Sequence, residues 1–395
     1  MDKVGGAMAE PRTGGRRKAR PVMSGKALST AGPDRAPTRS DRRAAARQPA
    51  PPTRPGRDRP TAAETRRSRL VVGLALAAVV ALAAGLALVT GLFSPPAGPA
   101  RAVPAATAHT LVRSPAAGIA FDGSDGWLAD DATGTLRRFD PSSGSYRSGP
   151  VTVGGHPVAV AAGAGEAWAT DVSGNTVVEV SARSGRVVGS PVTVGTDPVS
   201  VAVGEGGVWV ASLQAGTVTL IDPRSGQVTA TVALPDGAVR VAVGAGAVWV
   251  TGQSDSLTRI DPVPAGVSLR WTSVTVGQGP IGVAVSGSTV WVANTQSGTV
   301  SRVDSTTMKV TGTFPVPSAT GSGTTGGPTS IAVADGRVWV ADYGDARVVA
   351  LDSSTGRQVG TAVVLPGAVR QLVTGAGAIW AATANPGAVV RLDPS

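Results

Sequence analysis

The stretch VAVGEGGVWVASLQAGTVTLIDPRSGQV, residues 201–228, decides the fold class because its pattern returns six more times along the chain. Each copy contains a tryptophan, and successive tryptophans are 40 to 48 residues apart. The seven marker residues are Trp127, Trp168, Trp209, Trp249, Trp291, Trp339 and Trp380. Repeats of about 40 to 50 residues built from short alternating apolar runs are typical of β-propeller blades, each a four-stranded antiparallel sheet. The sequence therefore predicts an all-β protein with a seven-bladed β-propeller.

The clearest copy, residues 198–237, divides into four short runs separated by turns. The runs are VSVAV, VWVAS, TVTLID and QVTATVAL, and they are rich in the β-branched residues that favour a pleated sheet. In the turn DPRSG before the fourth run, Pro223 presets φ and Gly226 supplies the positive φ that a hairpin needs. The tryptophans are expected to pack between neighbouring blades.

The two ends of the repeat region predict how the ring closes. The last copy ends at VVRLDPS, directly after its third strand, so its fourth strand is absent from the C-terminus. The segment ATAHTLVRSP, residues 106–115, is an apolar run that leads into a proline and a first strand, as the fourth strands of other copies do. We therefore expect residues 107–113 to complete the seventh blade, which removes exposed sheet edges.

The first 106 residues differ from the repeats in composition. Residues 1–69 contain 18 Lys or Arg and 6 Asp or Glu, whereas the remaining residues contain 18 and 20. This basic segment is rich in Pro, Gly and Arg and has few large apolar residues, which predicts a disordered tail. Residues 70–93 contain no charged residue, and a helix of this length would cross the ~30 Å core of a bilayer. The sequence thus predicts a transmembrane helix at 70–93, a Pro/Ala linker at 94–106 and the propeller at 107–395.

Charges beside the apolar segment predict its orientation. Arg66, Arg67 and Arg69 precede it, whereas only Arg101 follows it before the propeller. Positive residues favour the cytoplasmic side, so we expect a single-pass protein of the cell membrane with a cytoplasmic N-terminus and an extracytoplasmic propeller. Cleavage within AVPAATAHT is an alternative, and TRRSRL resembles a twin-arginine signal except at Arg69.

Composition limits the chemistry that the chain can perform. It has no cysteine and two histidines, so disulfides, thiolate metal sites and a zinc or triad arrangement are not expected. The sequence predicts no cofactor, no metal site and no enzymatic activity. The propeller is close to neutral overall, which argues against nucleic-acid binding because phosphate contacts require a basic surface.

The phrase P-x-x-V-A-V-G-x-G-x-V-W-V-A, followed by G-T-V-x-x-I-D-P-x-S-G, resembles the repeat of YVTN-type propellers, also called YncE-like. These are relatives of the NHL and streptogramin (virginiamycin B) lyase propellers, and the resemblance covers about residues 107–395. It implies an extracytoplasmic ring in a group of mostly binding or scaffold modules.

In the lyases a histidine and a glutamate act with a magnesium ion. The Phe-Thr-Glu that follows the tryptophan in lyase repeats is absent here, and a lyase-like enzyme using His156 with a metal is an alternative function. A nucleic-acid-binding propeller is a second alternative.

One face of the predicted ring gathers polar loop residues. In propellers the loops after the second and fourth strands of each blade share one face, which predicts a rim of polar residues. The candidates for ligand binding on this rim are Asp130, Asp171, Asn294, Asp342, Tyr343, His156 and Asp197. A longer loop at residues 316–328 is a further candidate, because irregular loops on rigid scaffolds often bind. DGSDG at 122–126 resembles a calcium loop but aligns with hairpin turns of other copies.

Two arginines stand out in the first strands. Copies four and seven both contain Ala-Val-Arg, which places Arg240 and Arg370 where other copies have small residues. First strands line the central channel, so the two guanidinium groups are predicted to face each other and to bind a carboxylate or phosphate. The alternative is that they are solvated or pair with acids such as Asp130 or Asp342. The sequence thus predicts a non-catalytic, membrane-anchored module that binds an extracytoplasmic protein or a small anionic ligand.

Overall fold

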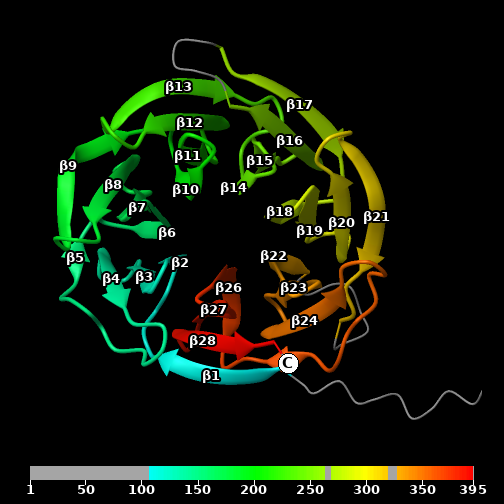
Figure 1. Ribbon diagram of the computed structural model, residues 1–395. Helices are drawn as coiled ribbons and strands as arrows, with labels where there is room; N and C mark the ends of the chain where they lie inside the picture. Colours follow the sequence, from blue (N-terminus) through cyan, green and yellow to red (C-terminus); the bar gives the residue numbers. More distant parts are fainter. Residues whose placement is uncertain (1–105, 263–267, 319–326, 395) are drawn as a thin grey trace, which may run out of the picture. The chain divides into compact units, whose positions relative to one another are not determined.

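The structure, a computed structural model, describes residues 106–262, 268–318 and 327–394. These residues form seven four-stranded antiparallel sheets arranged in a ring, which confirms the predicted all-β seven-bladed propeller (Figure 1). The predicted tail at 1–69, the predicted transmembrane helix at 70–93 and all but the last residue of the linker at 94–106 lie outside the described residues. Within the described ranges, no helix has the length and apolar character needed to cross a membrane.

Each blade runs outward from a first strand beside the central channel to a fourth strand at the outer wall (Figure 1). Blade 1 contains β2 (Gly118–Asp122), β3 (Asp125–Asp130), β4 (Thr135–Phe139) and β5 (Val151–Thr152). Blade 2 contains β6 (Pro157–Gly163), β7 (Glu166–Asp171), β8 (Thr176–Ser181) and β9 (Arg186–Thr193). Blade 3 contains β10 (Pro198–Gly204), β11 (Gly207–Ser212), β12 (Thr217–Asp222) and β13 (Gln227–Ala233).

The next three blades repeat this order. Blade 4 contains β14 (Arg240–Gly244), β15 (Ala247–Thr251), β16 (Ser256–Asp261) and β17 (Arg270–Thr275). Blade 5 contains β18 (Pro280–Ser286), β19 (Thr289–Asn294), β20 (Thr299–Asp304) and β21 (Lys309–Pro315). Blade 6 contains β22 (Pro328–Ala334), β23 (Arg337–Asp342), β24 (Arg347–Asp352) and β25 (Val363–Val364).

Blade 7 is assembled from both ends of the propeller. It contains β26 (Ala368–Gly375), β27 (Ala378–Ala384), β28 (Ala388–Asp393) and, as its fourth strand, β1 (Thr107–Val112). β1 lies beside β28 and pairs antiparallel with it (Figure 1). In this pairing His109 lies opposite Arg391. This pairing confirms the predicted closure of the ring by the N-terminal strand.

The hydrophobic core lies between the blades. The seven repeat tryptophans are 0–2% exposed. Trp209 of blade 3, for example, belongs to a buried cluster with Val241 and Val248 of blade 4. The equivalent tryptophans of the other blades occupy comparable clusters that reach the next blade. The prediction that the tryptophans pack between blades is confirmed, whereas the eighth, Trp271 on the outer strand β17, is 39% exposed.

The turns between third and fourth strands are held by their aspartates. Asp222 Oδ1 accepts a hydrogen bond from the Arg224 N–H at 2.9 Å, and Gly226 has φ of +66°. This is the hairpin expected from DPRSG. In blade 6, Asp352 accepts hydrogen bonds from the backbone and hydroxyl groups of Ser354 and Thr355, and these bonds lower its pKa to about 2. The segment 122–126 contains the hairpin turn between the first two strands of blade 1, because β2 ends at Asp122 and β3 begins at Asp125.

Candidate functional site

The central channel is lined by the seven first strands, and strand pairing defines one equivalent position on each of them. This position lies nine residues before the tryptophan of its blade. We call the seven residues the inner ring: Gly118, Ala159, Ser200, Arg240, Gly282, Ser330 and Gln371. Arg240 is thus the charged member of a ring of small or neutral residues.

Three members of the inner ring connect neighbouring blades by accepting a backbone hydrogen bond. Ser200 Oγ accepts from the Val241 N–H at 3.2 Å, and Ser330 Oγ accepts from the Leu372 N–H at 2.8 Å. Gln371 Oε1 accepts from the Ile119 N–H at 2.9 Å. In each case the donor belongs to the next blade, so an acceptor oxygen at this position stabilises the ring.

Arg240 is unsuited to this structural role because a guanidinium only donates hydrogen bonds. Its Nη1 donates to the Val199 carbonyl of the preceding blade at 3.3 Å. The connection to blade 5 is made instead by Thr251, whose hydroxyl donates to the Ile281 carbonyl at 2.9 Å. Within the described parts of the chain Arg240 forms no ion pair. Burial lowers the pKa of Arg240 from its usual range, since the half-buried guanidinium has lost water without gaining an anion.

Arg370 is placed differently from the prediction. The pairing of β26 with β27 is irregular between Val369 and Gln371, so Gln371 rather than Arg370 is the equivalent of Arg240. Arg370 Nη1 instead forms an ion pair with Asp131 Oδ2 of blade 1 at 2.9 Å. A bulge moves one residue out of the alternation of side chains. The two arginines therefore do not occupy equivalent channel positions, and the partner of Arg370 is Asp131 rather than the Asp130 or Asp342 named in the alternative.

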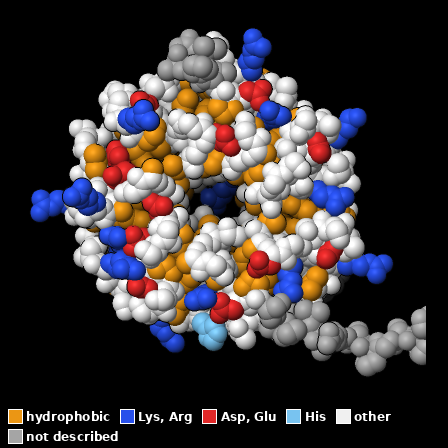
Figure 2. Space-filling model, viewed as in Figure 1, with side chains coloured by type: hydrophobic (Ala, Val, Ile, Leu, Met, Phe, Trp, Pro, Cys, Tyr) orange, Lys and Arg blue, Asp and Glu red, His pale blue; other side chains and the backbone are white. Residues whose placement is uncertain are grey.

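A cavity of about 270 Å³ in the channel is bounded by the first strands of blades 4 to 7. Arg240, Gly282, Ser330 and Gln371 of the inner ring contribute to its wall, and none of the described residues that line it is acidic. The Ser330 hydroxyl hydrogen and the Gln371 amide nitrogen are donors not consumed by the contacts that their oxygens make. Figure 2 shows Lys or Arg atoms inside the central opening. The cavity therefore presents donors and positive charge.

The aspartates and the asparagine predicted on the rim are 0–6% exposed: Asp130, Asp171, Asn294 and Asp342. Asp130 Oδ1 accepts the N–H groups of Ala132 and Thr133 at 3.1 Å, and Asp342 Oδ1 accepts that of Gly344 at 3.1 Å. These bonds shape the loop after the second strand. An aspartate followed within two or three residues by turn-forming residues is the sequence signal for this role. The side chains thus lie beneath the rim surface rather than on it.

The exposure of the rim candidates varies from the buried Asn294 to the exposed Tyr343. Tyr343 is 46% exposed. Asn294 Nδ2 donates to the hydroxyls of Thr299 and Ser301, which ties it to the third strand of its blade. Asp197 has φ of +62° at a turn where its N–H donates to Asn175. Of the candidate loop at 316–328, residues 319–326 lie outside the described residues.

Both histidines of the chain lie on exposed segments. His109 is on the outer strand β1, and His156 precedes β6. The His156 N–H donates to Asp171 Oδ1 at 2.9 Å, so the contact with this acid is made by the backbone. Neither histidine lines the described channel cavity. In the described ranges no three His, Cys, Asp or Glu residues are close enough to hold a metal.

No protein-family model and no curated protein matches the chain. Among solved structures, virginiamycin B lyase from Staphylococcus aureus is 16% identical with a TM-score of 0.61, over 73% of this chain and 98% of that one. A streptogramin B lyase is 15% identical with a TM-score of 0.62, over 75% and 100%. U3-55K is 11% identical with a TM-score of 0.61, over 72% and 98%. The chain is therefore a seven-bladed β-propeller with the fold of the streptogramin B lyases, a fold that differently named proteins share.

Proposed function

We propose that this protein is a membrane-anchored, extracytoplasmic binding module whose central channel binds a small anionic ligand. The observation that carries the proposal is Arg240, a donor-only side chain that sits in a ring of acceptors and small residues without an acidic partner in the described structure. A desolvated charge costs free energy unless an opposite charge or hydrogen bonds compensate it. An anion in the cavity would provide both.

The chemistry of the cavity indicates the ligand class. A guanidinium donates two parallel hydrogen bonds, which matches a carboxylate or a phosphate. Ser330 and Gln371 supply further donors from blades 6 and 7. The volume of about 270 Å³ lies slightly below the range of drug-sized pockets, which starts at roughly 300 Å³, and so favours a small anion.

Replacing Arg240 with alanine is expected to weaken anion binding by about 1.5–3 kcal/mol, the range for hydrogen bonds to charged groups. The full-length protein would be titrated with phosphate and with succinate by calorimetry at low and at high salt, and binding should weaken as salt screens the charge. Arg370→Ala is the matched control, because that guanidinium is already paired with Asp131. A parent protein that binds neither anion, or equal affinity in parent and Arg240→Ala, would contradict the proposal.

The topology follows from residues 66–93 and has its own test. With the arginine-rich flank inside, protease added to intact cells should remove epitopes of the propeller and spare a tag at the N-terminus. The tag becomes accessible only after the membrane is opened with detergent. Loss of the N-terminal tag from intact cells would instead show the opposite orientation.

Two other functions have weaker support. A lyase-like reaction would use His156 as a base with a metal, and what favours it is a likeness of fold at 15–16% identity. His156 is exposed and touches an acid through its backbone. Nucleic-acid binding would require a basic face, whereas the residues after position 69 contain 18 Lys or Arg against 20 Asp or Glu.

A further inference from the structure

The residue that faces each repeat tryptophan across the second and third strands differs between blades. The seven residues, in order, are Arg138, Glu179, Leu220, Arg259, Arg302, Ala350 and Arg391. In the four blades that have arginine, its Cζ lies 5.9–6.0 Å from the centre of the tryptophan ring. A guanidinium beside the tryptophan is thus the commonest arrangement in this ring.

Three of these arginines also join their blade to the next one. Arg138 Nη1 donates to the Ala182 carbonyl at 2.5 Å, and Arg259 Nη1 donates to the Ser305 carbonyl at 2.8 Å. Arg302 Nη1 donates to the Ser353 carbonyl at 3.2 Å. All three acceptors directly follow the third strand of the neighbouring blade. The arginine therefore acts as a staple between blades.

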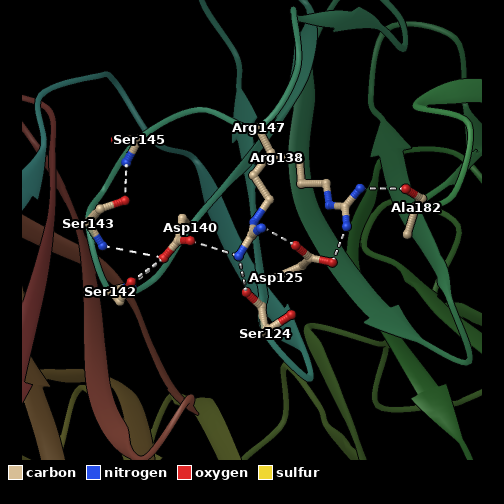
Figure 3. A network of polar contacts seen from close by, with 9 residues as sticks. All are labelled: Ser124, Asp125, Arg138, Asp140, Ser142, Ser143, Ser145, Arg147 and Ala182. Carbon is tan, nitrogen blue, oxygen red and sulfur yellow. Dashed lines mark hydrogen bonds and ion pairs between the residues drawn. The ribbon is translucent and has the colours of Figure 1, made fainter.

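In blade 1 an acid completes the staple. Arg138 forms an ion pair with Asp125, and Arg147 binds the same carboxylate at 3.0 Å (Figure 3). Asp125 lies two residues before the tryptophan of its blade. The carboxylate, the guanidinium and the Ala182 carbonyl thus form one connected group between blades 1 and 2.

Blade 2 has an acidic residue at the position of Asp125 but no arginine at the position of Arg138. Glu166 occupies the position of Asp125, and Glu179 replaces the arginine opposite Trp168. Glu166 Oε2 is buried and has no hydrogen-bond partner in the described structure. Two carboxylates therefore stand where the other blade has an ion pair.

The space beside these glutamates is a cleft between blades 2 and 3. It consists of two cavities of about 710 and 520 Å³ that share Glu179, Pro223 and Arg224. Glu166, Glu179 and the 1% exposed Trp168 line the larger one from blade 2. We call this the blade 2–3 cleft. Pro223 directly follows β12, the position whose carbonyl accepts the arginine staple in other blades.

The outer strand of blade 2 is bulged at the same place. Glu179 pairs with Val188, but Val177 pairs with Val192, so β9 contains additional residues between these pairs. Gly189, with φ of +64°, lies within this bulge and lines the smaller cavity. Bulges that re-aim a strand are common beside functional sites. This one lies beside Glu179, and its residues Val188 and Gly189 line the smaller cavity of the blade 2–3 cleft.

We propose that the blade 2–3 cleft binds an arginine side chain of a polypeptide partner, with Glu166 and Glu179 as its carboxylate acceptors. The partner's guanidinium takes the place that the protein's own arginine holds in blades 1, 4, 5 and 7. Its planar fork bridges two carboxylates and reaches a turn carbonyl, which a compact ammonium does less well. The site is independent of the channel, since none of its residues lines the channel cavity.

The charges around the cleft agree with this assignment. Burial raises the pKa of Glu166, with the Ser181 side chain opposing the rise. Burial also raises the pKa of Glu179, and the charge of Glu166 adds to it. From blade 3, Asp222 and the exposed Arg224 face the cleft, and Arg224 forms no ion pair in the described ranges. A carboxyl whose pKa is raised in the folded state destabilises the fold above that pKa.

The test measures binding of acetyl-Gly-Arg-Gly-amide to the full-length protein by calorimetry, with the citrulline peptide as the neutral analogue. Glu166→Gln and Glu179→Gln should each weaken binding of the arginine peptide about 10- to 100-fold, the range for one charged hydrogen bond. Glu205→Gln is the matched control, because Glu205 lies on the nearby turn between β10 and β11 but does not line the cleft. Arg240→Ala should leave this binding unchanged, which separates the cleft from the channel.

A charge replacement makes the test sharper. Glu179→Arg should recreate the staple of the other blades, abolish binding of the peptide and raise the melting temperature. Equal binding of the citrulline peptide, unchanged affinity in both glutamine variants, or peptide binding that appears only after Arg224→Ala would overturn the proposal. The last result would show that Arg224 fills the cleft itself.

Discussion

Deletion of residues 107–113 is expected to open the ring and to lower the melting temperature by roughly 10 °C or more. The expected loss of unfolding free energy is several kcal/mol, and each kcal/mol lowers the melting temperature by about 2–4 °C. Blade 7 would keep three strands, and β28 would expose the backbone groups that now pair with β1. Val112, which is 5% exposed in a cluster with Trp380, would also be lost from the core. An open sheet edge pairs readily with other chains, so the variant should associate.

Calorimetry and light scattering over a range of protein concentrations measure both effects. A synthetic peptide of residues 106–113 added to the deletion variant should restore the melting temperature, since it can re-form the missing strand by pairing with β28. A peptide of the same composition in scrambled order is the control. A deletion variant that stays monomeric and melts like the parent would show that β1 does not hold the ring closed.

Trp209→Ala is expected to cost about 3–5 kcal/mol of unfolding free energy, the range for emptying a large aromatic site in a core. Trp209 is 0% exposed and packs against the first two strands of blade 4. Its Nε1–H also donates to the Gly204 carbonyl at 3.1 Å, and the substitution removes this hydrogen bond. The loss therefore weakens the contact between two blades as well as the interior of one.

Trp271→Ala provides the comparison within the same protein. Trp271 lies on the outer strand β17 and is 39% exposed, so its removal should cost less than about 1.5 kcal/mol. Denaturant titration of both variants, with the slope of each transition checked for two-state behaviour, gives the two free energies. Similar losses for Trp209 and Trp271 would contradict the assignment of the core to the spaces between blades.

The sequence alone was sufficient to predict the architecture. Blade number follows from the recurrence of tryptophan every 40 to 48 residues, and strand pattern follows from the alternation within each copy. Both signals are local. Because seven copies repeat them, a strand that is ambiguous in one copy can be identified from the equivalent residues of the others. The closing strand was also predictable. The last repeat lacks a fourth strand and the N-terminal segment forms an extra one, so pairing the two removes both exposed sheet edges.

The candidate site required the tertiary structure. The spacing to the tryptophan already separates Arg240, nine residues before Trp249, from Arg370, ten before Trp380, but the ion pair of Arg370 with an aspartate of blade 1 is seen only in the folded ring. The turn-forming residues after Asp130 and Asp342 signal their role in the loop, whereas their burial, at 3% exposure, is seen only in the folded structure.

The sequence by itself determined the repeat, the seven blades, the ring closure and the tryptophan core, because these follow from periodicities of two residues within strands and about 41 residues between blades. Only the tertiary structure decided which charges are paired. Arg240 stands out because it forms no ion pair in the described ranges, and Glu166 and Glu179 stand out because the equivalent residues of blade 1, Asp125 and Arg138, form an ion pair with each other. That comparison depends on strand register, bulges and contacts with the next blade, which no single repeat encodes.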